Sequence, residues 1–166
     1  KFLSHIREVD AIIHLVRCFE SDKITHVNSK INPVADLETI KTEIILSDID
    51  IIQKKLEKGK KKLLEEKQIK ILEEKLKQLN QGEEIIANDE NEKRFLSNLG
   101  LLSIKPKIIV CNVDEESLAK GNSFTDQVKK KYSGEKVVVI CADIEDQIMG
   151  LDNNERETFM KEIGLN

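Results

Sequence analysis

Two short polar segments follow directly after apolar runs, and both carry groups that can bind a small molecule. The first is Asn112-Val113-Asp114-Glu115, and the second is Cys141-Ala142. In doubly wound sheets, ligands bind beyond the carboxyl ends of the strands, so polar residues there can face a bound molecule. An asparagine amide offers donors and an acceptor, whereas a carboxylate offers acceptors alone. The two segments therefore predict opposite sides of one pocket.

A purely structural role for the same residues is the alternative. In that interpretation Asn112 caps a loop, Cys141 and Ala142 belong to the core, and Glu115 and its acidic neighbours are solvated. For a single asparagine at a strand end, this interpretation is the simpler one. A choice between the two needs agreement from several other segments of the chain.

The sequence shows no pattern typical of a metal site or an activated nucleophile. Three cysteines, Cys18, Cys111 and Cys141, are widely separated, and each closes an apolar run. A zinc site needs paired cysteines or histidines at short spacing, so we expect buried reduced thiols and no metal at these residues. His14 lies inside a predicted strand and is interpreted as a core residue. No residue is assigned general acid or base chemistry.

The elements that must position these residues are strands that alternate with helices. Three apolar runs rich in β-branched residues predict parallel strands covered on both faces: Ala11–Cys18, Lys107–Asn112 and Lys136–Cys141. Amphipathic patterns predict helices after the second and third runs: Phe124–Lys130, Ile144–Met149 and Asn153–Ile163. This alternation predicts an α/β domain with right-handed crossovers.

A long helical segment interrupts this alternation. From Pro33 to Gly82, apolar residues recur at spacings of three and four, with a break at Gly59. We expect an antiparallel helical hairpin with Lys58–Lys62 at its tip, followed by a short helix around Glu90–Asn98. A single unbroken helix is the rival prediction, because one glycine costs a helix only about 1 kcal/mol.

Composition and charge limit the class of protein. Of the 166 residues, 39% are apolar, and no run approaches the roughly 18 apolar residues of a membrane span. A cytoplasmic protein is therefore expected, and the absence of an initial methionine suggests a piece of a longer chain. Ten lysines against five acidic residues lie between Lys54 and Lys77 in a chain of net charge -4. Such a basic arm attracts RNA phosphates, although a solvated lysine face is an equal alternative.

Several segments together resemble the YchF/Obg-like ATPases, which are P-loop NTPases related to translation factors. The resemblance rests on the opening Lys1–Ile12, the helical insertion, the strand ending Asn112-Val113-Asp114-Glu115, the strand ending Cys141-Ala142, and the closing Asn154–Leu165. It implies a partial P-loop NTPase fold, Rossmann-like, with an inserted coiled-coil hairpin. Residues 1–32 and 101–166 would form the C-terminal half of the nucleotide domain, and residues 33–100 the insertion.

The resemblance also implies roles for the strand-end residues. Asn112 would pair with N6 and N7 of adenine, Val113 would pack on the purine, and Glu115 would replace the aspartate that binds guanine in related GTPases. The fifth motif of the family would fall on Cys141-Ala142, where a backbone N–H approaches the base. ATP is then expected to bind at least as readily as GTP.

Other implied features lie outside this sequence. It contains neither Gly-x-x-x-x-Gly-Lys-Ser/Thr nor Asp-x-x-Gly, so the groups that hold phosphates and Mg²⁺, and a β-rich TGS domain, would belong to the parent protein. The parent is expected to be an ATPase or GTPase that binds the ribosome and regulates translation or the stress response, with Lys58, Lys60, Lys61 and Lys62 contacting RNA. The chain alone is expected to be inactive and to hold no cofactor tightly. The alternative is a non-catalytic module whose hairpin binds a protein partner.

Overall fold

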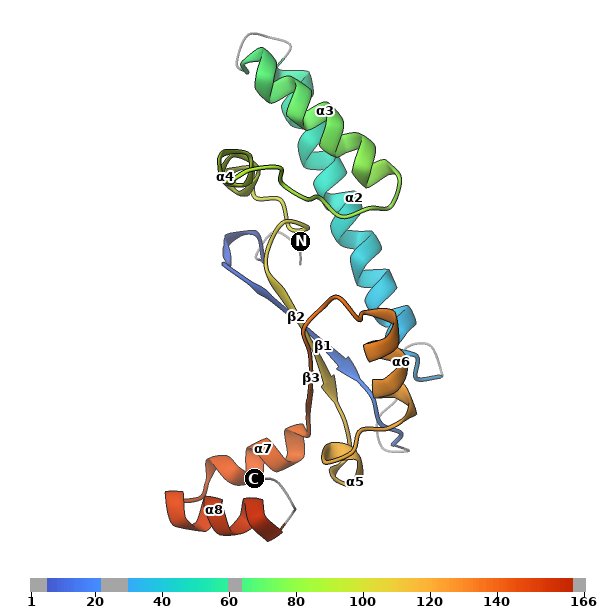
Figure 1. Cartoon of the computed structure of the whole chain (residues 1–166), viewed down its shortest axis with the longest axis vertical. Helices are drawn as coiled ribbons and strands as arrows, with labels where there is room; N and C mark the ends of the chain where they lie inside the picture. Colours follow the sequence, from blue (N-terminus) through green and yellow to red (C-terminus); the bar gives the residue numbers. More distant parts are fainter. Residues whose placement is uncertain (1–5, 22–29, 60–63, 163–166) are drawn as a thin grey trace. The chain divides into compact units, whose positions relative to one another are not determined.

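The structure is a computed structural model that describes residues 6–21, 30–59 and 64–162. The described elements, labelled as in Figure 1, are η1 (Ile6–Glu8), β1 (Ile12–Arg17), α2 (Pro33–Gly59), α3 (Glu66–Asn80), α4 (Glu90–Asn98), β2 (Lys107–Asn112), α5 (Glu115–Leu118), α6 (Ser123–Lys131), β3 (Val137–Ile140), α7 (Ala142–Met149) and α8 (Asn153–Glu162). None of these helices has the length and apolar character needed to cross a bilayer.

Contacts along the chain define two compact units. The helical unit comprises 1–12 and 38–106, and the sheet unit comprises 13–37 and 107–166. The assignment of 33–100 to an inserted domain stays a prediction. Each unit has its own apolar core and is described separately below.

The sheet has three parallel strands in the order β1-β2-β3. β2 and β3 pair in a register that places Asn112 opposite Ile140. The amide of Ile12 donates to Pro106 at 2.9 Å and that of Cys18 donates to Asn112 at 2.7 Å, so β1 and β2 also run in the same direction. The predicted α/β class is confirmed, and the strand bounds differ from the predicted ones by no more than the end residues.

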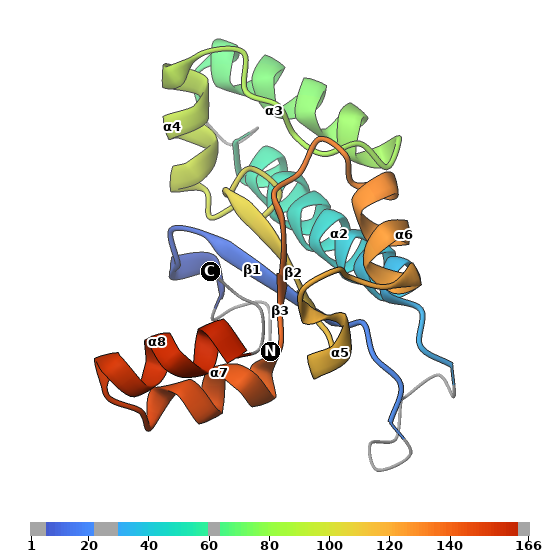
Figure 2. The same ribbon diagram turned by 60° about the horizontal axis from the view of Figure 1, so that its bottom comes forward.

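The core of the sheet unit lies on one side of the strands. Its buried members are Val16, Cys18, Leu37, Ile109, Cys111, Val113 and Val128. α6 contributes Val128 and Phe124 to this cluster, and α7 and α8 lie side by side in Figures 1 and 2 around a smaller one built on Ile144 and Ile148.

The opposite side of β1 is uncovered. Ile13 is 68% exposed and Leu15 is 61% exposed, and β1 is an edge strand in the described sheet. Alternate residues of a strand point to opposite faces, so these two side chains share one face. The prediction that both faces of every strand are covered is therefore wrong for β1 within the described part of the chain.

The helical insertion is a hairpin. α2 ends at Gly59 and α3 begins at Glu66, and the two helices lie side by side in Figures 1 and 2. Ile45 and Ile52 of α2 share a core with Leu72 and Leu79 of α3. The predicted hairpin is confirmed, and the prediction of one unbroken helix is wrong. Packing of the two apolar stripes against each other stabilises the hairpin more than the helix propensity of the intervening lysines stabilises one continuous helix.

An aspartate inside the apolar stripe of α2 holds the turn that precedes β2. Asp48 is fully buried, and its carboxylate accepts from the backbone N–H groups of Leu102 and Ser103 at 2.9 and 2.8 Å. The Ser103 hydroxyl donates to the same carboxylate at 2.6 Å. Burial raises the pKa of Asp48, while these hydrogen bonds act in the opposite direction. The carboxylate thus holds the backbone of Leu102 and Ser103 against α2 within the helical unit.

A buried ion pair connects α3 to α4. The Nζ atom of Lys75 has no exposed surface and lies 2.8 Å from Glu92 and 2.9 Å from Glu74. The side chain of Asn88 donates to Glu92 at 3.1 Å. Burial alone would lower the pKa of Lys75, but its two carboxylate partners outweigh burial and raise it.

Candidate functional site

The two polar segments predicted to form one site meet at the carboxyl edge of the sheet. The backbone N–H of Val113 donates to the carbonyl of Ile140 at 2.8 Å. The backbone N–H of Ala142 donates to Oδ1 of Asn112 at 2.9 Å. This side-chain hydrogen bond joins the last residue of β2 to the first residue of α7. The sheet register, in which Asn112 faces Ile140, places the two groups within reach.

The same hydrogen bond occupies groups to which the sequence analysis gave ligand roles. One lone pair of Oδ1 of Asn112 is already used, and the N–H of Ala142 is already donated. The Nδ2 group of Asn112 has no acceptor among the described residues. A purine at this edge would therefore meet a side-chain donor and an acceptor whose orientation is set before it binds.

The remaining predicted residues differ in exposure. Glu115 and Ala142 are exposed, whereas Cys141 is only 1% exposed and precedes α7 at its N-cap position. Val113 is 2% exposed and packs in the core of the sheet unit. The side chain of Val113 is enclosed by residues of the same chain. Its packing on a purine stays a prediction.

A four-residue helix, α5, follows the asparagine loop and was not predicted. Asp114 caps it by accepting from the backbone N–H of Ser117 at 3.0 Å. Glu115 is the first residue of this helix and lies on its surface. Asp114 therefore acts as a cap, and Glu115 is the carboxylate of the segment that is available to a ligand.

Asn122 is a second organising residue that the sequence analysis missed. Its Nδ2 donates to the carbonyl of Cys18 at 2.7 Å, and its Oδ1 accepts from Phe124 and Thr125 at 3.0 and 3.1 Å. It thus caps α6 and ties that helix to the end of β1. The signal was present as an asparagine directly before a helical pattern, which is a preferred N-cap.

The glycine before this cap is required by its backbone. Gly121 has φ of +73°, a conformation that residues with a side chain rarely adopt. A Cβ atom at this position would lie 2.6 Å from Oγ1 of Thr125, which is itself in the cap of α6. Gly121 therefore permits the turn that brings Asn122 to β1.

The cysteines are buried and form no disulfide among the described residues. Cys18 and Cys111 lie at the ends of neighbouring strands with fully buried side chains. A hydrogen bond with Cys111 and burial both raise the pKa of Cys18 above its usual value, so this thiol stays protonated and unreactive. These two residues contribute to the core beneath the site.

The described residues contain no group of three or more His, Cys, Asp or Glu side chains able to hold a metal ion. Glu115 and Asp114 do not gather with a third carboxylate. The described residues therefore do not supply a set of ligands that fits Mg²⁺ by itself. Ligands for that ion would have to come from bound phosphates and from other parts of the protein.

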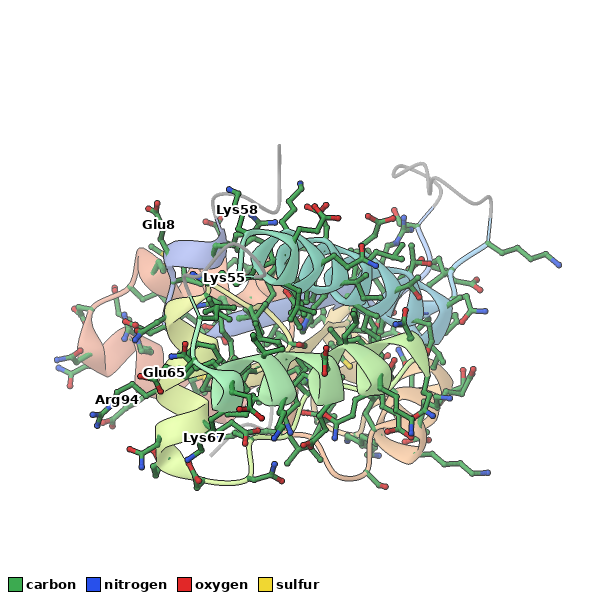
Figure 3. The ribbon with its side chains drawn as sticks, turned by 90° about the horizontal axis from the view of Figure 1, so that it is seen from above. Glu8, Lys55, Lys58, Glu65, Lys67 and Arg94 are labelled. Atoms are coloured by element: carbon green, nitrogen blue, oxygen red, sulfur yellow. The ribbon has the colours of Figure 1, made fainter. Side chains whose placement is uncertain are left out.

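The tip of the helical unit carries charges of both signs. Lys55 and Lys58 lie near the end of α2 that leads to the tip, and Glu65 and Lys67 lie at the start of α3; Figure 3 also labels Glu8 of η1 and Arg94 of α4. Lys58, Lys67 and Arg94 are exposed. Three lysines predicted to contact RNA, Lys60, Lys61 and Lys62, lie outside the described residues. The described cations Lys58 and Lys67 thus flank the predicted basic tip on α2 and α3.

No family model matches this sequence. It is 36% identical to the ribosome-binding ATPase YchF of Bacillus subtilis and 40% identical to that of Escherichia coli O157:H7, each over 99% of this chain and 48% of the relative. A Mycoplasma genitalium protein of the same name is 38% identical with the same coverage. The chain spans about half the length of the curated relatives it matches.

The fold is similar to that of a solved protein. The structure described as the Schizosaccharomyces pombe YchF GTPase superposes on 99% of this chain and 48% of its own, with a TM-score of 0.87 and 24% sequence identity. This likeness concerns the fold. With the sequence matches, it confirms the predicted resemblance to YchF proteins along nearly the whole chain.

Proposed function

We propose that this chain is the base-binding part and the helical arm of a YchF-type nucleotide hydrolase that takes ATP, and also GTP, and acts on the ribosome in the cytoplasm. The observation that carries the proposal is the hydrogen bond from Ala142 to Asn112, which joins two strand ends at the edge where doubly wound sheets bind ligands. Asn112, Glu115 and Ala142 surround the base, with Val113 and Cys141 supporting them from the core.

The open edge of the sheet supports a site that is shared with further protein. A three-stranded sheet with an uncovered apolar face at β1 is incomplete as an α/β layer. Further strands beside β1 would supply the phosphate-binding loop, and helices packed on this face of the enlarged sheet would cover Ile13 and Leu15. Mg²⁺, held there with the phosphates, would neutralise charge that develops during phosphoryl transfer.

The helical arm supports the ribosomal part of the proposal. The name of the relatives, ribosome-binding ATPase, states their partner. In this chain, Lys58 and the consecutive Lys60, Lys61 and Lys62 concentrate positive charge at the tip, with Arg94 on the neighbouring α4. Such charges bind phosphate backbones by releasing counterions. We place the contact with ribosomal RNA at this tip.

The test of base binding uses the protein that contains this chain together with its phosphate-binding half. Ala142→Phe would place a ring at the exposed start of α7, beside Asn112, and should weaken ATP affinity about tenfold or more, equivalent to about 1.4 kcal/mol. Ser133→Phe is the control, since it adds the same ring at an exposed residue before the other end of β3. Calorimetric titration measures both. Equal ATP affinity for the two variants would remove the base site from this edge.

A further inference from the structure

The chain between α3 and α4 shows the side-chain alternation of a β-strand. It crosses from one helix to the other without forming a helix or a strand of its own (Figure 1). Ile85 is only 4% exposed and packs in the core of the helical unit, whereas Ile86 is 74% exposed. Ala87 is half-buried and Asn88 is exposed. Successive residues of a strand point to opposite faces, so Ile86 lies on the face turned away from the core.

The backbone of this segment is held at both ends and is unpaired in the middle. The N–H of Glu83 donates to the carbonyl of Gln78 at 3.1 Å. The side chain of Asn88 donates to the buried carboxylate of Glu92 at 3.1 Å. The backbone groups of residues 85–87 make no hydrogen bond with any described residue. A strand-like segment with free backbone donors and acceptors is a template for an added strand.

A hollow of about 480 Å³ lies along the same segment. Its lining includes the aliphatic side chains of Ile86 and Ile104 and the polar residues Asp89, Glu90 and Lys93. Residues 83–90 contain four acidic side chains and no basic one. The single lysine of the lining, Lys93, lies 3.6 Å from the carboxylate of Glu90 and is partly neutralised by it. The surface therefore combines aliphatic contacts with negative charge.

We propose that the segment 83–88 binds an extended peptide of a partner protein, in which aliphatic residues alternate with lysine or arginine, by adding that peptide as a strand. The free backbone groups of residues 85–87 pair with the main chain of the peptide. Its aliphatic side chains cover Ile86, and its cations face the acidic residues of the segment. A nucleic acid fits this surface poorly, because its phosphates would meet those carboxylates. The surface is independent of the proposed nucleotide site.

The experiment titrates the protein that contains this chain into a fluorescein-labelled peptide, Lys-Val-Lys-Val-Lys-Val-Lys, and measures anisotropy. Binding should weaken as salt is added, because opposite charges attract across the contact. Ile86→Lys removes the aliphatic contact and adds a like charge, so the affinity should fall about tenfold or more. Leu46→Lys is the control, since it makes the same change at a 55% exposed leucine of α2 in the same unit. Its affinity should stay within about twofold of that of the unmodified protein.

Changes in the peptide test the mode of binding. Each edge of a strand carries the N–H groups of alternate residues, so one peptide is N-methylated on its valines and another on its inner lysines. One of the two should lose its affinity and the other should keep it. The peptide Glu-Val-Glu-Val-Glu-Val-Glu should not bind, because its carboxylates meet like charges. Bound peptide should also slow amide hydrogen exchange in residues 85–87.

Several results would overturn the proposal. They are the absence of saturable binding up to about 1 mM peptide, equal affinity of Ile86→Lys and Leu46→Lys, and full affinity of both N-methylated peptides. Tighter binding of a single-stranded RNA oligonucleotide than of the peptide, with loss of both in Ile86→Lys, would make the surface a nucleic-acid site instead. Thermal melting establishes that the variants are folded. Should Ile86→Lys not fold, Ile86→Ser replaces it, with an expected fall of about threefold from the lost aliphatic contact alone.

Discussion

Glu115 offers a way to alter the base preference of the proposed site without disturbing the fold. It is exposed and is the first residue of α5, where an aspartate is equally suited to the helix dipole. Guanine presents two donors, N1–H and the 2-amino group, to a carboxylate. We expect Glu115→Asp to raise GTP affinity relative to ATP affinity by about two- to tenfold. Titration with both nucleotides measures the change.

The adjacent residue provides the control for this prediction. Glu116→Asp makes the same chemical change at the next exposed position of α5 and should leave the preference unaltered. An unchanged ratio of GTP to ATP affinity in Glu115→Asp would mean that Glu115 does not face the base.

Lys75 is the residue whose loss should cost the helical unit most. Lys75→Met leaves Glu92, which has only 8% of its side chain exposed, without its buried cation. We expect the free energy of unfolding to fall by about 3–5 kcal/mol, measured by urea denaturation. Replacing both residues, Lys75→Met with Glu92→Leu, should recover much of this loss. A double variant as unstable as the single one would show that the pair itself, and not the stranded charge, provides the stability.

The raised pKa of Lys75 gives this pair a definite pH dependence. A lysine with a higher pKa in the folded protein than its usual 10.5 contributes stability that is fully present below that pH. The contribution is lost as the pH rises through the folded-state pKa. Lys75→Met has no such group, so its free energy of unfolding should fall less steeply than that of the unmodified protein as the pH rises above about 10.5, measured by urea denaturation at several pH values.

At the scale of elements, the clearest prediction concerns the lysines at the tip of the helical hairpin. Charge reversal of Lys60, Lys61 and Lys62 should weaken ribosome or RNA association and flatten the dependence of log affinity on log salt concentration, while nucleotide affinity is unchanged. Co-sedimentation at several salt concentrations measures both quantities. Reversal of Lys129, Lys130 and Lys131 on α6 changes the same charge in the sheet unit and serves as the control.

If the tip variant retains the affinity and salt dependence of the unmodified protein, the lysines are a solvated end of the hairpin. The apolar or acidic faces of the arm would then be where a partner binds.

Some elements could be predicted closely from the sequence, and others could not. β2 and α4 have the predicted bounds, because a continuous apolar run and a capped amphipathic pattern are unambiguous local signals. α5 was missed because four residues are too short for a periodic pattern. The described residues leave one face of β1 exposed although the sequence predicted that it is covered, because an apolar run indicates a preference for burial and does not identify what covers it.

The buried polar residues of the helical unit could also be predicted only in part from the sequence. Asp48 lies four residues after Ile44 and four before Ile52, and Lys75 lies between Leu72 and Leu79 at spacings of three and four. A charged residue within an apolar stripe indicates that a buried hydrogen-bond or ion-pair partner is present. Its identity, Ser103 or Glu92, depends on chain pairing that no local pattern encodes. Similarly, both halves of the candidate site were predicted, whereas the direct contact between Asn112 and Ala142 required the structure.

At the scale of the molecule, hydrolysis should require more protein than this chain contains. Positioning and charge neutralisation of the phosphates supply most of the catalysis in phosphoryl transfer, and the sequence has no Gly-x-x-x-x-Gly-Lys-Ser/Thr segment. We expect the 166-residue chain to show negligible ATPase activity in a phosphate-release assay. Turnover comparable to that of the protein with its phosphate-binding half would contradict the proposal that the phosphate-binding groups lie outside this chain.

The uncovered face of β1 has a consequence for the handling of this chain during synthesis and purification. An edge strand with exposed apolar side chains is a template for pairing with another molecule, so the chain alone should self-associate as its concentration rises. Ile13→Lys with Leu15→Lys should suppress that association in size-exclusion chromatography. In a longer protein whose helices cover this face, the same lysines would be buried and should cause misfolding. The same two substitutions should thus keep the isolated chain from self-associating and cause the longer protein to misfold.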